Sequence, residues 1–225
     1  MKIGILGTGM VGRAHASRLA ALGHQVMIGT GDIVKTLGRT EPDEMGTPAF
    51  SEWRLQNENI ILGVFADTAM FGEMVFNCIK GEFAVEVLEE LSKELYGKIL
   101  VDISNPLDFS QGMPPTLLIG NTDSLGEQIQ FALPNVKVVK AFNTVNAFLQ
   151  VNPIWLLSGN HTLFVAWDNP QAKSEVIQIA LNYGWIDIID LGDMTWARGM
   201  EMWLPLWLRL WWTIGSPMFN LKIVR

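Results

Sequence analysis

The chain has 225 residues, 49% of them hydrophobic and 17% charged, which predicts a folded domain with a well-buried core and excludes a disordered chain. Its net charge of −7 at pH 7 argues against nucleic acid as a partner, because phosphate binding needs clustered Lys and Arg. The single cysteine, Cys78, excludes an internal disulfide and a cysteine-based metal site, and we expect no metal.

Nothing in the sequence resembles a secretory signal or a membrane span. Glycines interrupt the first apolar run almost at once, unlike the continuous apolar core of a signal peptide. The longest apolar stretch, 202–214, contains Pro205 and Arg209 and falls short of the ~20 residues that a spanning helix needs. We therefore expect a cytoplasmic protein that does not associate with membranes.

Short apolar runs alternate with helix-length segments along the chain, which predicts a parallel α/β sheet. Strands are expected at 2–6, 25–28, 60–65, 74–79, 98–103, 136–142, 162–167 and 185–190. Most of these runs are continuously apolar, as in strands covered by helices on both faces. Helices are expected at 11–22, 83–95, 125–133 and 171–183. The predicted fold class is α/β: a Rossmann-type, doubly wound, mostly parallel sheet with a small C-terminal helical portion.

A glycine-rich segment, GTGMVG at 7–12, follows the first expected strand and opens the first expected helix. In such a unit Gly7 permits the tight turn, Gly9 lets the backbone approach a pyrophosphate, and Gly12 lets the helix pack on the strand. Amides at the helix N-terminus then point at the phosphates. The alternative is an ordinary glycine-rich turn. We predict that a dinucleotide binds here, with contacts from Gly7, Thr8, Gly9, Met10 and Val11.

The end of the second strand bears on the choice between NAD and NADP. An NAD-binding unit places Asp or Glu there to hold the ribose 2′-hydroxyl. This chain has Gly29 at that position, followed by Thr30, whose hydroxyl suits a 2′-phosphate, and by Gly31. These residues favour NADP(H) and leave NAD possible.

Three charged residues follow the same strand. Lys35 and Arg39 lie where either could approach a 2′-phosphate after a loop rearrangement, or could simply form a solvated helix face. Asp32 has the opposite effect, because its carboxylate repels a phosphate. The predicted cofactor site therefore includes Gly29, Thr30, Gly31 and Lys35, with Arg39 as an alternative cation.

Residues after three further strands complete the predicted site, because ligands of open parallel sheets bind beyond the carboxyl ends of the strands. Cys78, Ile79 and Lys80 are expected along the adenosine or ribose, with Cys78 more typical of a small buried hydrophobe than of a reactive thiol. Asn143 and Thr144 suit a nicotinamide carboxamide. The remaining predicted contacts are Asn105 and Pro106. The alternative for each polar residue is a helix cap or a satisfied loop.

The C-terminal part of the sequence differs from the rest in that it predicts a helix rich in tryptophan. A long helix is expected at 194–212 with a kink at Pro205, and Trp203, Trp207 and Trp211 recur every four residues as an apolar stripe. We expect this stripe to pack against the sheet or a second subunit, which gives a homodimer. The expected division is a Rossmann domain at 1–190 and a helical dimerisation extension at 191–225. A long loop at 108–123 is expected to be functional or mobile.

Five segments together resemble the NADP oxidoreductases that use the deazaflavin coenzyme F420: GTGMVG at 7–12, LGHQVMIGT at 22–30, VVKAFNTV at 138–145, WLPLWLRLW at 203–211 and MFNLKIVR at 218–225. The third also resembles the cytosolic reductase domain of six-transmembrane ferric reductases. The resemblance implies NADPH across the strand ends and a nicotinamide that meets a flavin-like partner in a cleft. Members commonly carry Arg after the Ser or Thr of the second strand. Gly31 stands there in this chain, which leaves NAD use or replacement by Lys35 or Arg39 as alternatives.

No catalytic acid or base is expected, because His15, His24 and His161 have no partner that spacing identifies. Hydride transfer between a nicotinamide and a deazaflavin needs ring alignment rather than a protein acid. The favoured function is therefore an NADP-dependent oxidoreductase with a flavin or deazaflavin as its small-molecule electron acceptor. The alternatives are an NADPH-dependent reductase of a small carbonyl or imine, and a non-catalytic NAD(P)(H)-binding redox sensor.

Overall fold

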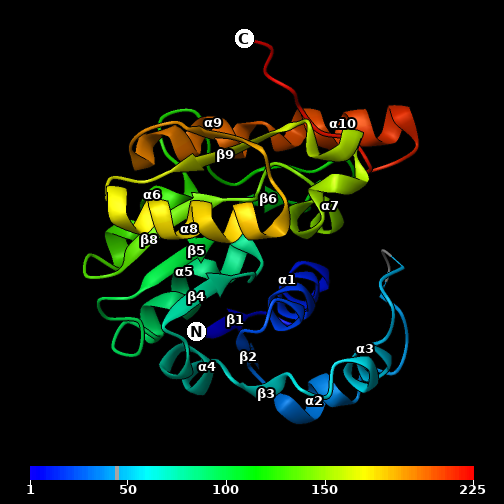
Figure 1. Cartoon of the computed structure of the whole chain (residues 1–225), viewed down its shortest axis with the longest axis vertical. Coiled ribbons are helices and arrows are strands. Elements are labelled where there is room, and N and C mark those ends of the chain that lie inside the picture. The colour runs from blue at the N-terminus through cyan, green and yellow to red at the C-terminus, as the bar shows by residue number, and fades with distance from the viewer. Residues whose placement is uncertain (44–45) are drawn as a thin grey trace.

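The structure is a computed structural model that describes residues 1–43 and 46–225. An eight-stranded sheet runs through the molecule in the order β3-β2-β1-β4-β5-β8-β9-β10 (Figure 1). Neighbouring strands are parallel except β8 and β9, which pair in the antiparallel sense. The strands are β1 Lys2–Leu6, β2 Gln25–Thr30, β3 Ile61–Val64, β4 Met74–Asn77, β5 Ile99–Asp102, β8 Lys137–Ala141, β9 Thr162–Ala166 and β10 Asp187–Asp190. The predicted α/β fold with a mostly parallel sheet is confirmed.

Helices cover both faces of the sheet, as its apolar strands require. Because successive strand residues point to opposite faces, Gly4 faces α4 (Phe65–Phe71) while Ile5 faces α1 (Met10–Ala21). The α1 face also carries α7 (Ala147–Val151), which packs on α1, and α8 (Pro170–Tyr183), which packs on α7 and β8. The other connecting helices, α5 (Gly81–Glu90) and α6 (Leu125–Ala132), pack on each other.

Two short helices in the first third of the chain, α2 (Ile33–Leu37) and α3 (Phe50–Gln56), were not expected from the sequence. Each is too short to show a helical repeat of apolar residues, since one turn takes 3.6 residues. In Figure 1 they lie beside β3, on the rim of the molecule near the start of the chain. They matter for the site because they carry the residues that follow β2.

The C-terminal part departs from the expected single helix. A 3₁₀ turn, Met194–Trp196, leads into α9 (Ala197–Met202), and a separate helix, α10 (Leu204–Ile214), follows. Pro205 lies in the first turn of α10, where its missing N–H costs nothing. The expected kink is therefore a helix boundary. None of the helices within residues 1–43 and 46–225 has the length and apolarity needed to cross a bilayer.

The segment expected to be a loop at 108–123 is partly ordered by a small hairpin. Its strands are β6 (Leu107–Asp108) and β7 (Thr116–Leu117), which pair in the antiparallel sense. β5 ends at Asp102, and the hairpin begins five residues later, at Leu107. It therefore lies next to the carboxyl ends of the strands.

Candidate functional site

The three glycines of the turn between β1 and α1 have distinct structural roles. Gly7 has φ +115°, and a Cβ built on it would lie 2.5 Å from the carbonyl oxygen of Cys78. A Cβ on Gly12 would overlap the carbonyl oxygen of Gly7. Around Gly9, by contrast, a Cβ would meet no atom of the described chain within 4 Å. Gly7 and Gly12 are thus required by the fold, whereas Gly9 leaves open space at the N-terminus of α1 that fits a closely approaching pyrophosphate.

Predicted residues from three elements meet in one cavity of about 250 Å³ at the carboxyl edge of the sheet. Its lining includes five of them: Val11, Cys78, Ile79, Lys80 and Asn105. Burial, and next the charge of Asp102, raise the pKa of the Cys78 thiol. The neutral thiol is unreactive, as expected of a small apolar side chain.

Two asparagines bridge the ends of β5 and β8. The Asn105 side-chain amide donates to the Asn143 carbonyl oxygen at 3.0 Å, and the Asn143 side-chain amide donates to Asn105 Oδ1 at 2.9 Å. Asn143 Oδ1 is buried and has no partner among the described residues. An unpaired buried acceptor is costly, so this oxygen fits a ligand that brings an N–H donor.

Thr144 follows this pair and is almost fully buried. Its carbonyl oxygen accepts a hydrogen bond from Trp203 Nε1 at 3.0 Å, which connects the strand end to the junction of α9 and α10. Pro106 directly follows Asn105, and its carbonyl oxygen accepts from the Leu118 amide of the hairpin segment at 2.8 Å. The predicted residues at 105–106 and 143–144 are therefore brought together with the C-terminal part.

Gly29 is placed inside β2 rather than at its end. A Cβ there would lie 2.6 Å from Thr68 Oγ1, so the close packing of α4 demands glycine at this position. The strand continues to Thr30, whose hydroxyl lies 2.7 Å from the Thr36 hydroxyl. Asp32 caps α2 by accepting from the Lys35 backbone amide at 2.9 Å. The side chain of Lys35 is exposed on that helix.

Two arginines lie near the glycine turn, and the prediction included only one of them. Arg39 Nη2 donates to Thr8 Oγ1 at 2.6 Å, and its guanidinium lies 5.1 Å from the Phe50 ring centre. Arg13, on α1, is 6% exposed and donates through Nη1 to the Pro48 carbonyl oxygen at 2.6 Å. Burial, and next the positive charge of Arg39, lower the pKa of Arg13, so the two cations interact. Arg13 was not predicted, and its only signal in the sequence is its place directly after Gly12.

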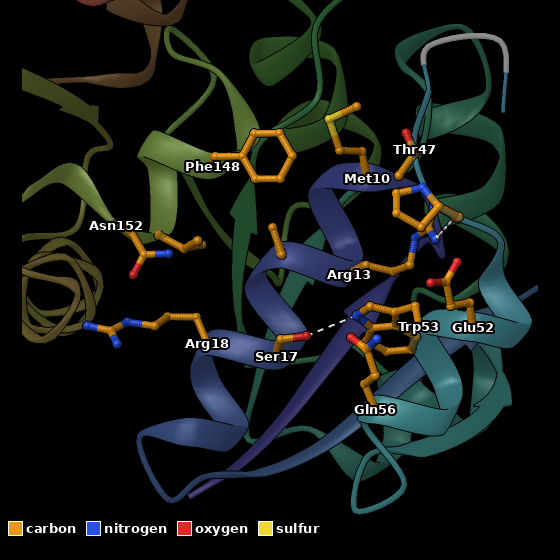
Figure 2. Close-up of a pocket in the computed structure, with 13 residues that line it drawn as sticks. Met10, Arg13, Ser17, Arg18, Thr47, Glu52, Trp53, Gln56, Phe148 and Asn152 are labelled. Carbon is orange, nitrogen blue, oxygen red and sulfur yellow. Dashed lines mark hydrogen bonds between the residues drawn. The ribbon is translucent and has the colours of Figure 1, made fainter. Parts of the chain in front are cut away.

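A second cavity, of about 380 Å³, lies along the outer face of α1 (Figure 2). It is lined by residues of α1, α3 and α7, and Trp53 Nε1 donates to Ser17 Oγ at 2.9 Å on its wall. Met10 is a predicted site residue that reaches it, and Arg13 points toward it from the same helix. This cavity continues the site from the glycine turn along α1.

A buried ion cluster lies under the strand ends and was not predicted. Lys140 Nζ contacts Asp102 Oδ2 at 2.8 Å and Glu201 Oε1 at 2.7 Å, all three side chains being at most 1% exposed. Glu201 also accepts from the amides of Leu125 and Gly126 at the start of α6. Burial acts to lower the pKa of Lys140, but the two carboxylates raise it above its usual range. The one sequence feature that could have revealed the cluster is Lys140, a lysine inside the apolar run 136–142.

His15 is held in a neutral form. Its Nδ1 lies 3.0 Å from the Tyr183 hydroxyl and its Nε2 lies 2.9 Å from Gln150 Oε1. Complete burial lowers the pKa of His15 to about 4, against the weaker effect of the Gln150 hydrogen bond. This histidine connects α1, α7 and α8 and does not line either cavity described above.

The strand, glycine turn and helix, with polar residues beyond the ends of neighbouring parallel strands, define a Rossmann-type dinucleotide-binding protein. The family model described as NADP oxidoreductase, coenzyme F420-dependent, matches residues 2–106. An F420-dependent NADP reductase of Methanocaldococcus jannaschii is 32% identical over 218 residues, which cover 93% of this chain and 92% of that protein. The chain therefore belongs to the family of coenzyme F420-dependent NADP oxidoreductases, and it is an NADP-dependent oxidoreductase.

Two further relatives are informative. A crystal structure from Arthrobacter sp. FB24, named provisionally as an F420-dependent NADP-reductase, is 50% identical, covers 100% of both chains and superposes with a TM-score of 0.94. Rat metalloreductase STEAP3 is 29% identical over 216 residues, or 96% of this chain. The chain spans 38% of the length of that metalloreductase.

Proposed function

We propose that this chain transfers a hydride between NADP(H) and a flavin or deazaflavin of the coenzyme F420 type. The observation that carries the proposal is the buried, unpaired Asn143 Oδ1 at the strand ends, and the open space beside Gly9 supports it. The carboxamide of a nicotinamide brings the N–H donor that this oxygen lacks. The named activity of the Methanocaldococcus jannaschii relative supports the choice of acceptor.

The chain's own residues fit such a cofactor. The amides of Met10 and Val11 at the start of α1 suit the pyrophosphate, and the Asn105–Asn143 pair would orient the nicotinamide. When bound, the nicotinamide supplies the hydride that the flavin-like partner accepts. The protein's contribution is then to bind and align the two rings.

The titratable groups near these strand ends favour alignment over proton transfer. Lys140, Asp102 and Glu201 are buried and bound to one another, so none is poised to protonate a substrate. Lys80, which lines the smaller cavity, is an exposed residue. Reduction of a carbonyl or imine needs a positioned proton donor, so this arrangement favours a flavin-like acceptor.

Spectrophotometry tests the proposal. The protein is mixed with NADPH and oxidised coenzyme F420, FMN or FAD, and the reduced-nicotinamide absorbance is followed against the same mixture without protein. We expect NADPH oxidation with at least one acceptor. Tight NADPH binding without oxidation by any of them would favour the redox sensor, and oxidation only with small carbonyls or imines would favour that reductase.

We also propose that the protein is a homodimer formed through exposed apolar residues of α10. Trp207 is buried by its contact with Phe219, with ring centres 5.3 Å apart, so part of the tryptophan stripe packs within the chain. Leu206, Trp212 and Ile214 are left exposed on the same helix. Sedimentation should give twice the 25.1 kDa chain mass, and a Trp212→Glu variant should sediment as a monomer. A monomeric wild-type protein would contradict this proposal.

A further inference from the structure

We infer that Arg39 binds the 2′-phosphate of NADP(H) and so gives the protein its preference for NADP over NAD. This inference rests on the proposed function, since it concerns the same dinucleotide. Binding units for NADP place an arginine near the end of the second strand. In this chain the residues there, Thr30, Gly31 and Asp32, carry no positive charge.

The position of Thr8 connects Arg39 to the end of the second strand. Thr8 is the second residue of the glycine turn, and the turn is bonded to β2 because the Gly7 amide donates to the Gly29 carbonyl oxygen at 3.0 Å. Between this turn and the end of β2 lies the place of the adenosine ribose in Rossmann units. Arg39, bonded to Thr8 through Nη2, therefore has its guanidinium beside that ribose.

Arg39 is also held in place before any ligand arrives. Its guanidinium packs over the ring of Phe50, the first residue of α3, and its carbonyl oxygen accepts from the Ser51 amide at 3.3 Å. A guanidinium has five N–H donors, so the bonds from Nη2 to Thr8 leave others for phosphate oxygens. A side chain fixed in this way loses little conformational entropy on binding.

The local charge favours an anion. Arg13 adds a second guanidinium. Burial lowers the pKa of both Arg13 and Arg39, and the negative charge of Asp43 acts against that lowering in each. One carboxylate oxygen of Asp32 accepts a hydrogen bond from the Lys35 backbone amide and so caps α2. This hydrogen bond offsets part of the repulsion between Asp32 and a phosphate. Lys35 and Arg39 are both exposed residues, but the guanidinium of Arg39 is anchored on Thr8 and Phe50 beside the glycine turn. Arg39 is therefore the better placed of the two cations.

Binding titrations without an acceptor test the inference. NADPH and NADH differ only in the 2′-phosphate, and the fluorescence of the reduced nicotinamide reports binding of both. We expect wild-type protein to prefer NADPH. The variant Arg39→Gln should bind NADPH about 10- to 100-fold more weakly, the usual effect of losing a charged hydrogen bond, with NADH affinity unchanged. The matched variant Lys35→Gln should keep the wild-type preference.

The outcomes separate the inference from the proposed function. If Arg39→Gln binds NADPH as tightly as wild type, or if Lys35→Gln suffers the loss instead, the inference is wrong and the proposed function survives. If Arg39→Gln weakens NADPH and NADH equally, the arginine supports the fold and does not select the phosphate. If wild-type protein binds neither nucleotide, or shows no preference for NADPH, the proposed function fails as well.

Discussion

Single residues of the glycine turn divide into two that the fold requires, Gly7 and Gly12, and one, Gly9, where the fold leaves room for a side chain. Gly12 has no room for a side chain because the Gly7 carbonyl occupies that space, whereas the space beside Gly9 is open. A sequence motif cannot make this distinction, since all three glycines look alike in it. The structure separates them because it shows what a methyl group would meet at each position.

Alanine substitutions should reproduce this division. Gly12→Ala overpacks the turn, so we expect a loss of about 1–3 kcal/mol in the free energy of unfolding. Gly9→Ala should change that free energy by no more than about 0.5 kcal/mol. Because its methyl group meets the pyrophosphate, its NADPH affinity should nevertheless fall about tenfold or more. Urea unfolding and fluorescence titration measure the two quantities, and equal destabilisation by both variants would refute the assignment.

The Asn105–Asn143 pair gives a second test at this scale. Asn143→Ala removes the unpaired Oδ1 and the bond to Asn105, so NADPH should bind about tenfold more weakly. Binding of 2′,5′-ADP, which lacks the nicotinamide, serves as the control and should not change. An equal loss for both ligands would show that Asn143 supports the turn rather than the nicotinamide.

At the scale of elements, the sequence predicted all eight strands of the sheet within a few residues, because continuous apolar runs mark covered strands. It also placed Asn105 and Asn143 after the fifth and sixth expected strands, each at a strand end. Their reciprocal hydrogen bonds depend on strand order and register, which apolar runs do not encode. The contact of Arg39 with Thr8 depends on the path of the segment around α2 and α3, helices too short to leave a periodic signal.

His15 makes the packing of three helices depend on pH. Its pKa falls from 6.5 in the unfolded chain to about 4 when it is buried between α7 and α8, so the unfolded state binds more protons between these values. Stability contributed by this group is full above about pH 6.5 and is lost as the pH falls, by up to ~3 kcal/mol near pH 4. Urea unfolding across this range should show a shallower loss for His15→Gln than for wild type. Identical profiles of stability against pH for the variant and the wild type would contradict this role of His15.

At the scale of the whole molecule, the Lys140 cluster connects the sheet to the C-terminal part. Asp102 belongs to β5, Lys140 to β8 and Glu201 to α9, so one buried ammonium joins both parts of the chain. The division expected at residue 190 remains a prediction, but this contact implies that the extension does not fold independently of the sheet. The amino-acid composition could not reveal the Lys140 cluster, because the cluster forms only when β5 and β8 pair in register.

Removing the cation should therefore destabilise the protein as a unit. Lys140→Met leaves two buried carboxylates without their partner, which costs about 3–5 kcal/mol of unfolding free energy. Lys137→Met on the same strand, where the side chain is half-buried, should cost no more than about 0.5 kcal/mol. Urea unfolding monitored by tryptophan fluorescence compares the two. A loss below about 1 kcal/mol for Lys140→Met would count against the role of the cluster.

The activity that we propose is direct hydride transfer from NADPH to a flavin-like ring aligned by the protein. The most direct measurement uses NADPH deuterated at the transferred position of the nicotinamide, with oxidised coenzyme F420 as acceptor and mass spectrometry of the reduced product. Because hydride moves to a carbon of the deazaflavin, the deuterium should be retained there. We expect one deuterium in each molecule of reduced coenzyme F420. Reduced F420 that carries only solvent hydrogen, or a failure to reduce F420, FMN and FAD alike, would contradict direct hydride transfer.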